Sequence, residues 1–222
     1  MADSIETQVA ALRRFVSDAA HELGTPLTAL RINLELIDDE LIPPALEQVE
    51  RIDALTRSLL TISKLEALDS RPQHDDVDLS VLLRELADFY ASRAEQANLS
   101  FDLEILDDSI KIKGDANQLK TLVNNLLENA IKFTPAGGQI RVGLKTQDDA
   151  VQLTVANTGI GIPEDDLPQL FSRFHRGHNA SAYPGSGLGL AIVKAIADRH
   201  RAKVSVKSDQ SGTVFVVQFR TY

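Results

Sequence analysis

Apolar residues near the start of the chain recur at alternating intervals of four and three positions, the spacing of a buried stripe along one face of a coiled-coil helix. The stripe consists of Ile5, Val9, Leu12, Val16, Ala19, Leu23, Pro26 and Leu30. The pattern continues through Leu34 and Ile37, and it predicts a helix from about Ser4 to Asp39.

A second helical stripe follows the break at Ile42-Pro43-Pro44. It consists of Leu46, Val49, Ile52, Leu55, Leu59, Ile62 and Leu65. Two amphipathic helices joined in this way predict an antiparallel helical hairpin. Because two helices alone bury both stripes poorly, we expect two copies of the chain to form a four-helix bundle, and therefore a homodimer.

The remainder of the chain mixes helical and strand-like patterns. A polar stretch with Pro72 and His74 predicts a linker at 71–78, between a first domain at 1–70 and a second at 79–222. In the second domain the expected helices are 79–98, 115–133 and 189–200, and the expected strands are 99–106, 110–113, 139–146, 150–157, 203–208 and 213–220. The chain is therefore expected to be an α+β protein of two domains.

The charge, the apolar content and the lack of cysteine argue against several classes of function. The net charge of -9 and the absence of a long basic run argue against binding to nucleic acid or to an anionic membrane surface. No stretch is apolar enough to span a bilayer and the polar N-terminus is unlike a signal peptide, so we expect a soluble chain. The chain lacks cysteine, and His74, His178 and His200 lack metal-ligand spacing, which favours reading them as ordinary surface residues.

One histidine stands out because it lies off the first apolar stripe. His21 falls between the stripe positions Ala19 and Leu23, so its imidazole is expected to face solvent. Glu22 could take the proton from Nδ1 and leave Nε2 as a nucleophile, and Thr25 lies one turn further along the same face. The alternative is a solvated His-Glu pair with no chemical role.

A second candidate cluster lies in the helix expected at 115–133. Asn125, Asn129 and Lys132 are spaced i, i+4 and i+7, so they share one face. Such a face suits a triphosphate with magnesium, because an amide oxygen can supply one metal ligand while the ammonium offsets phosphate charge. The alternative is a polar face exposed to solvent.

Two glycine-rich segments follow this helix. The sequence Asn157-Thr158-Gly159-Ile160-Gly161-Ile162-Pro163 comes directly after an expected strand, and Gly185-Ser186-Gly187-Leu188-Gly189-Leu190 opens an expected helix. Glycine lets the backbone approach phosphate oxygens, and the free amides at a helix start favour an anion. Taken singly, each segment could be only a tight turn.

Taken in order, these segments resemble the catalytic core of a bacterial sensor histidine kinase. The segment from His21 to Pro26 resembles the H box, and Asn125 to Lys132 resembles the N box. The G1, F and G2 boxes are similar to Asn157–Gly161, Phe171–Phe174 and Gly185–Gly189. The resemblance implies a helical dimerisation and phosphotransfer domain, then an α/β sandwich of the Bergerat type with a lid at about 162–186 that is mobile without ligand.

The resemblance also implies roles for individual residues. His21 would accept the phosphoryl group from ATP, Glu22 would act as the base, and Thr25 would position water when the protein dephosphorylates its response regulator. Asn129 would bind Mg²⁺. Phosphate contacts are implied for Asn125 and Lys132, and Arg176 would reach the terminal phosphate. The remaining nucleotide contacts implied are Asn157, Gly159, Gly161, Ile162, Phe174, Gly185, Gly187, Leu188 and Gly189.

By the same resemblance, the reaction would be autophosphorylation of His21 followed by transfer to an aspartate of a response regulator receiver domain. The chain would act in the cytoplasm as a fragment of a membrane-anchored parent. Two rival functions remain open: an ATPase of the gyrase type, which carries a glutamate where Asn125 stands, and a dimeric scaffold whose nucleotide site has decayed.

Two residues depart from the family pattern. Asn157 stands where an aspartate usually accepts a hydrogen bond from the adenine amino group; its amide oxygen can still accept, at a cost of about 1–2 kcal/mol in affinity. Gly24 replaces a common arginine and costs roughly 1 kcal/mol of helix stability relative to alanine, so with Pro26 it softens the helix near His21.

Overall fold

The computed structural model describes residues 26, 29, 42–67, 75–147 and 149–220. The chain divides into two compact units, Met1–Ser63 and Lys64–Tyr222. The first expected helix and its residues His21, Glu22, Gly24 and Thr25 lie outside the described residues, apart from the isolated positions 26 and 29. None of the described helices is both long enough and apolar enough to cross a membrane.

Helix α2 spans Ile42–Ala67 and confirms the second predicted helix. Its two prolines fall in the first turn, where a missing N–H costs no intrahelical hydrogen bond. Leu55, Ile62 and Leu65 are buried, and their spacing of seven and three matches the predicted stripe.

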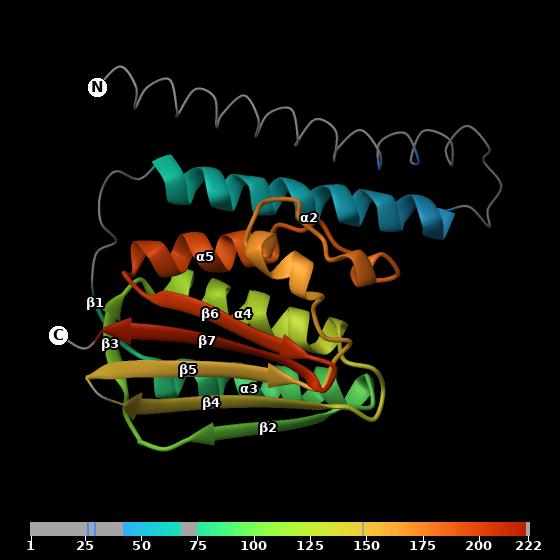
Figure 1. The fold of residues 1–222 in the computed structure, drawn as a ribbon. Helices are drawn as coiled ribbons and strands as arrows, with labels where there is room; N and C mark the ends of the chain where they lie inside the picture. The colour runs from blue at the N-terminus through green and yellow to red at the C-terminus, as the bar shows by residue number, and fades with distance from the viewer. Residues whose placement is uncertain (1–25, 27–28, 30–41, 68–74, 148, 221–222) are drawn as a thin grey trace. The chain divides into compact units, whose positions relative to one another are not determined.

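The second unit is built on a five-stranded sheet in the order β2-β4-β5-β7-β6 (Figure 1). Its strands are β2 Ser100–Ile105, β4 Gln139–Gln147, β5 Ala150–Asn157, β6 Lys203–Asp209 and β7 Gly212–Arg220. β2 runs parallel to β4, and every other pair in this sheet is antiparallel. A smaller antiparallel sheet pairs β1, Asp75–Asp78, with β3, Lys111–Gly114.

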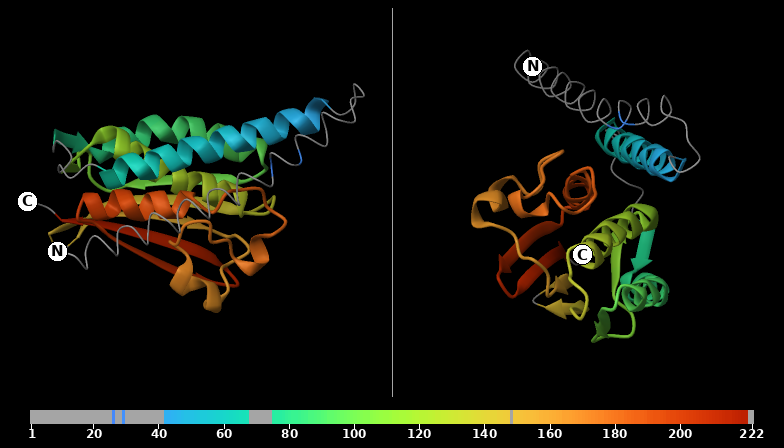
Figure 2. Two further views of the ribbon diagram at one scale, coloured as in Figure 1. Left: turned by 90° about the horizontal axis from the view of Figure 1, so that it is seen from above. Right: turned by 90° about the vertical axis from the view of Figure 1, so that its right-hand side faces the viewer.

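Three helices cover one side of the large sheet, as Figures 1 and 2 show. They are α3 Leu79–Gln96, α4 Ala116–Lys132 and α5 Gly189–Arg199. In β5 every second residue is buried, from Val151 through Val155, which is the alternation of a strand with one covered face. Leu122 of α4 and Ile196 of α5 are fully buried in the same core. The predicted α+β fold is therefore confirmed for this unit.

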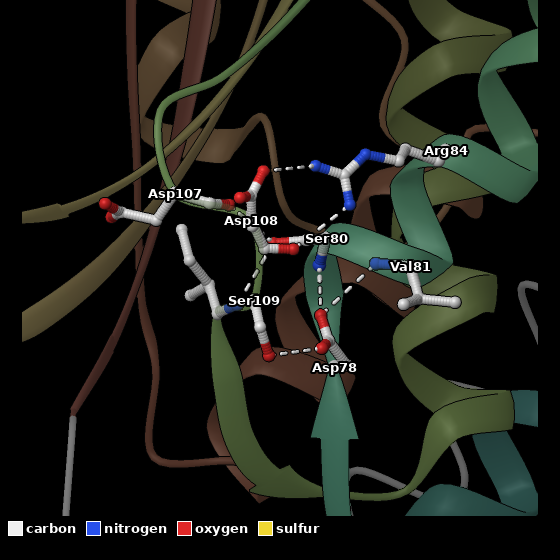
Figure 3. A network of polar contacts seen from close by, with 8 residues as sticks. Asp78, Ser80, Val81, Arg84, Asp107, Asp108 and Ser109 are labelled. Atoms are coloured by element: carbon white, nitrogen blue, oxygen red, sulfur yellow. Dashed lines mark hydrogen bonds and ion pairs between the residues drawn. The ribbon is translucent and has the colours of Figure 1, made fainter.

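A polar network fixes the start of α3 (Figure 3). The Asp78 carboxylate accepts hydrogen bonds from the backbone N–H groups of Ser80 and Val81, which caps the helix. Its other oxygen accepts a hydrogen bond from the Ser109 hydroxyl at 2.6 Å. Because Arg84 also donates to the Asp108 carbonyl oxygen at 3.1 Å, the loop before β3 is tied to the first turns of α3.

Two expectations from the sequence were wrong. Residues Asp75–Asp78, expected to end the linker, form β1, since they pair with β3 and lead directly into the cap of α3. His200, expected on the surface, is only 6% exposed. Its Nδ1 donates to the Ile196 carbonyl and its Nε2 accepts from the Asp115 N–H, so the ring is a buried bridge from the end of α5 to the start of α4.

Candidate nucleotide-binding site

The expected N-box residues lie on α4, and two of them contact the glycine segment that opens α5. The Asn125 amide Nδ2 donates to the Thr121 carbonyl oxygen at 2.8 Å. Its Oδ1 lies so close to Gly189 that a β-carbon there would stand 2.8 Å away. A residue at the first position of α5 must therefore be glycine for this approach to occur.

Lys132, in the last turn of α4, lies against the first glycine of the same segment. A β-carbon at Gly185 would overlap the Lys132 ammonium. The ammonium also stands over the Phe133 ring, 4.5 Å from its centroid. Burial, and to a lesser extent the neighbouring charge of Arg176, lowers the pKa of Lys132 below its usual value. A half-buried cation of this kind is ready to pair with an anion.

Asn129 lies between these two residues on the same face of α4 and is half-buried. Within the described part of the chain its carboxamide has no hydrogen-bond partner. No cluster of three or more His, Asp or Glu side chains suited to a metal ion occurs among the described residues. A magnesium ion here would therefore take one amide oxygen from the protein and its other ligands from phosphates and water, which fits the preference of Mg²⁺ for oxygen ligands and retained water.

Asn157 ends β5 and is 9% exposed. Its Nδ2 donates to the Thr134 hydroxyl at 3.0 Å, two residues beyond the N box. Gly159 is required two residues later, because a β-carbon there would overlap both Asn157 Nδ2 and the Phe133 carbonyl oxygen. The G1 box is thus in direct contact with the two residues that follow the N box, Phe133 and Thr134.

The turn beyond Asn157 is held by backbone contacts to the end of β6. Gly161 has φ +68°, and a β-carbon there would overlap the Asp209 carbonyl oxygen. The backbone N–H of Ile162 donates to the Ser208 hydroxyl at 2.9 Å. These contacts fix the point at which the expected lid begins.

The F box meets the G2 box through two residues of unusual backbone geometry. Phe174 has φ +60°, which a residue with a β-carbon rarely adopts. Gly187 has φ +72°, and a β-carbon there would lie 2.7 Å from the Phe174 carbonyl carbon. Leu188, the next residue, is fully buried. Only glycine allows these two segments to pack so closely.

The expected lid contains two short 3₁₀ helices, η2 Glu164–Gln169 and η3 His178–Ala180. Arg176, expected at the terminal phosphate, donates from Nη2 to the carbonyl oxygens of Ala180 at 2.8 Å and Tyr183 at 2.5 Å. In this structure its guanidinium therefore binds the lid's own backbone. The Tyr183 ring in turn packs against Phe133, with centroids 5.2 Å apart.

A buried carboxylate joins the two short helices. The Asp166 side chain is 1% exposed and accepts hydrogen bonds from the His178 backbone N–H at 2.8 Å and ring Nδ1 at 2.7 Å. Burial acts to raise the pKa of Asp166, but the hydrogen bonds from His178 outweigh it and hold the pKa below its ordinary value. Asn179 links η3 to the G1 turn by donating to the Gly161 carbonyl at 3.2 Å.

Family comparisons agree with this arrangement of boxes. The family described as "Histidine kinase-, DNA gyrase B-, and HSP90-like ATPase" matches residues 114–222. The "His Kinase A (phospho-acceptor) domain" matches residues 11–68. This chain belongs to the sensor histidine kinases.

Individual histidine kinases are similar over nearly the whole chain. The kinase/phosphatase MprB of Mycobacterium leprae is 35% identical over 229 residues, which cover 96% of this chain and 42% of MprB. The sensor histidine kinase CusS of Escherichia coli strain K12 is 32% identical over 228 residues, which cover 98% of this chain and 47% of CusS. The chain therefore spans less than half the length of these curated relatives.

Solved histidine kinases share the fold. The structure of AdeS from Acinetobacter baumannii has a TM-score of 0.74 and 25% identity, covering 90% of this chain and 98% of that chain. ThkA, solved in complex with the response regulator protein TrrA, has a TM-score of 0.78 and 23% identity, covering 98% of this chain and 64% of that chain.

A cavity of about 400 Å³ lies at the end of β5 in this kinase core. Asn157 and Thr158 form part of its wall, together with Arg141 and Lys207 on the sheet face opposite the helices. The N-box residues of α4 do not line it. The cavity therefore adjoins the G1 box but is separate from the cluster formed by Lys132 and the G2 glycines.

Three residues that contact the candidate site were not singled out from the sequence. Thr134 lies two residues beyond the N box, so its hydroxyl beside an expected polar cluster was a usable signal. Tyr183 lies inside the expected lid, but its contact with Phe133 depends on how the lid folds. Gly212 has φ +145°, and a β-carbon there would overlap the Asn157 carbonyl oxygen, a proximity created by the pairing of β5 with β7.

Proposed function

We propose that this chain is the kinase core of a two-component system, which transfers the γ-phosphoryl group of ATP to His21 and then to an aspartate of a response regulator. The observation that carries the proposal is the contact of the N box with the G2 box, where Asn125 faces Gly189 and Lys132 faces Gly185. An amide, an ammonium and a glycine-rich helix start that lie together suit the phosphates of a nucleotide.

In the first step, Nε2 of His21 attacks the γ-phosphorus in line with the leaving group. The N–P bond forms as the bond from phosphorus to the β–γ bridging oxygen breaks, and ADP departs. The proton on Nδ1 passes to Glu22, so the phosphorylated imidazole remains neutral. Catalysis then depends chiefly on positioning and on offsetting the phosphate charge.

The residues proposed to hold the nucleotide are those of the N, G1, F and G2 boxes. Lys132 and Asn125 would contact phosphates, and Asn157 would accept a hydrogen bond from the adenine amino group. Asn129 would supply one ligand to Mg²⁺, which neutralises phosphate charge when bound. Arg176 would exchange the lid carbonyls of Ala180 and Tyr183 for the terminal phosphate when the lid closes on ATP.

The proposed partners follow from the family. The helical hairpin would pair with a second copy in a four-helix bundle, and the receiver domain of a response regulator would dock beside His21. MprB is named a kinase and phosphatase, and Thr25 is our candidate for positioning water in a phosphatase reaction. We place this core in the cytoplasm, attached to a membrane-anchored parent.

Incubation with γ-labelled ATP and Mg²⁺ tests the function. The wild-type protein should acquire label that is lost in acid and retained in base, as expected for a phosphoramidate, and His21→Gln should acquire none. Label retained in His21→Gln would exclude His21 as the acceptor. Release of free phosphate far in excess of protein labelling would instead favour the gyrase-type ATPase reaction.

A further inference from the structure

Asn157 belongs to a short chain of hydrogen bonds that ends on the backbone of α4. Its Nδ2 donates to the Thr134 hydroxyl at 3.0 Å, and that hydroxyl donates to the Ala130 carbonyl oxygen at 2.5 Å. Both side chains are buried, with Asn157 at 9% and Thr134 at 7% exposure. Water therefore competes little with these bonds.

The direction of this chain fixes the orientation of the carboxamide. A hydroxyl carries one proton, and that of Thr134 is committed to the Ala130 carbonyl. While that bond is kept, the hydroxyl oxygen can only accept from Asn157. If the carboxamide turned over, Oδ1 would face that oxygen with no proton between them, unless the hydroxyl gave up its bond to the Ala130 carbonyl. Either way one buried hydrogen bond is lost, which is unfavourable.

The remaining polar atom of Asn157 is its Oδ1. It accepts no hydrogen bond from the described residues, and it is not among the buried polar atoms that lack a partner, so it is open to solvent or ligand. An aspartate has two equivalent acceptors, so its orientation has no effect on what it can bind. An asparagine presents a donor at one end and an acceptor at the other.

We propose that Thr134 is a positioning residue that makes the site select 6-amino purines, because it holds Asn157 with Oδ1 toward the base. The inference rests on the proposed function, in which Asn157 contacts the nucleotide base. Adenine donates its 6-amino group to Oδ1. Hypoxanthine and guanine carry an oxygen at position 6, which would face Oδ1 without a proton. Once released from Thr134, the carboxamide can turn and offer Nδ2 to that oxygen.

Comparing the binding of ATP and inosine triphosphate (ITP) tests the proposal. The base of ITP carries an oxygen in place of the 6-amino group of adenine, and a proton on the neighbouring N1. Wild-type protein should bind ATP at least about tenfold more tightly than ITP in isothermal titration calorimetry. Thr134→Val, which keeps the shape but loses the hydroxyl, should reduce this ratio to about threefold or less. Thr134→Ser restores the hydroxyl and should restore the ratio.

The ratio of the ATP and ITP affinities distinguishes a change in the orientation of the Asn157 carboxamide from general damage to the site. General damage would weaken the binding of both nucleotides alike. An unchanged ATP/ITP ratio in Thr134→Val would overturn the proposal. If wild-type protein bound neither nucleotide, the proposed function itself would fail instead. If Thr134→Val does not fold, the ATP and ITP affinities of Asn157→Asp are measured instead. Its two acceptor oxygens should reject ITP at least as strongly as the wild-type protein does. Equal binding of ATP and ITP by this variant would refute the proposal.

Discussion

The Lys132 ammonium occupies the space beside Gly185 where a β-carbon would stand. The last turn of α4 is thereby joined to the segment that opens α5, although the two residues are far apart in the sequence. A cation placed beside a glycine-rich helix start combines a mobile positive charge with fixed backbone donors. An added β-carbon at residue 185 would therefore act directly on the position of this cation.

Gly185→Ala should lower the affinity for ATP by about tenfold or more, which corresponds to the loss of about one hydrogen bond to a charged group. Two effects act together. The new methyl group displaces the Lys132 ammonium, and the φ of +150° at residue 185 is nearly restricted to glycine. Calorimetric titration with ATP and Mg²⁺ measures the change.

Gly143→Ala is the matched control for this substitution. Gly143 lies within β4, and the nearest atom to a new β-carbon would be the Thr154 Cβ at an ordinary 3.8 Å. The control should bind ATP as the wild type does. Equal affinities in wild type and Gly185→Ala would show that the contact of Lys132 with Gly185 is unrelated to nucleotide binding.

Asn157→Asp should bind ATP more tightly, by about 1–2 kcal/mol, or on the order of tenfold in affinity. A carboxylate makes a charge-assisted hydrogen bond to the adenine amino group, whereas a carboxamide makes a neutral one. The Thr134 hydroxyl can turn its proton from the Ala130 carbonyl to the new carboxylate, so the variant keeps a partner inside the core. Affinity no higher than wild type would reject this account of the departure at residue 157.

The fold could be predicted largely from side-chain periodicity, because each helix and strand of the second unit presents one apolar face. The β5 prediction of 150–157 coincides with Ala150–Asn157, where buried and half-buried residues alternate. β1 could not be found in this way. Its sequence Asp75–Asp78 is mostly charged, and only Val77 is buried, so its strand conformation depends on pairing with β3.

The site residues divide in the same way. Asn125, Lys132 and the glycine segments could be singled out as candidates, because helical spacing and glycine content are properties of the local sequence. The structure shows that they lie together, while their roles stay predictions. The role of Gly212 could not, since it depends on the register that sets β7 beside Asn157. His200 was misjudged because a histidine near a helix end is usually exposed, and only the packing of α5 on α4 buries it.

Asp166→Asn should destabilise the second unit at pH 7 by about 1–3 kcal/mol, because a buried carboxylate bonded to His178 is lost. The pKa of Asp166 lies below its ordinary value of 3.8 in the folded protein. A carboxyl lowered on folding contributes stability above its unfolded pKa and loses that contribution as pH falls through the folded pKa. The difference between variant and wild type should therefore shrink below about pH 4.

Urea denaturation at neutral and acidic pH measures this difference. Asp165→Asn is the matched control, since Asp165 neighbours Asp166 in η2 but is exposed. The control should match wild type within about 0.5 kcal/mol at every pH. If the loss in free energy of unfolding caused by Asp166→Asn were constant from pH 7 to pH 3, the charge of the carboxylate would contribute nothing to stability.

His200→Leu should reduce the free energy of unfolding by about 1–3 kcal/mol while leaving ATP affinity unchanged. The leucine fills much of the volume of the ring but cannot accept the N–H of Asp115, the capping residue of α4, which then lies partly buried without a partner. Urea denaturation gives the stability, and Gln218→Leu, at an exposed position of β7, controls for added apolar surface. The His200 bridge joins α5 to the first residues of α4, whereas Asn125 and Lys132 lie further along that helix. We therefore expect the substitution to affect stability and not ATP binding. A fall in ATP affinity equal to that of Gly185→Ala would contradict this expectation.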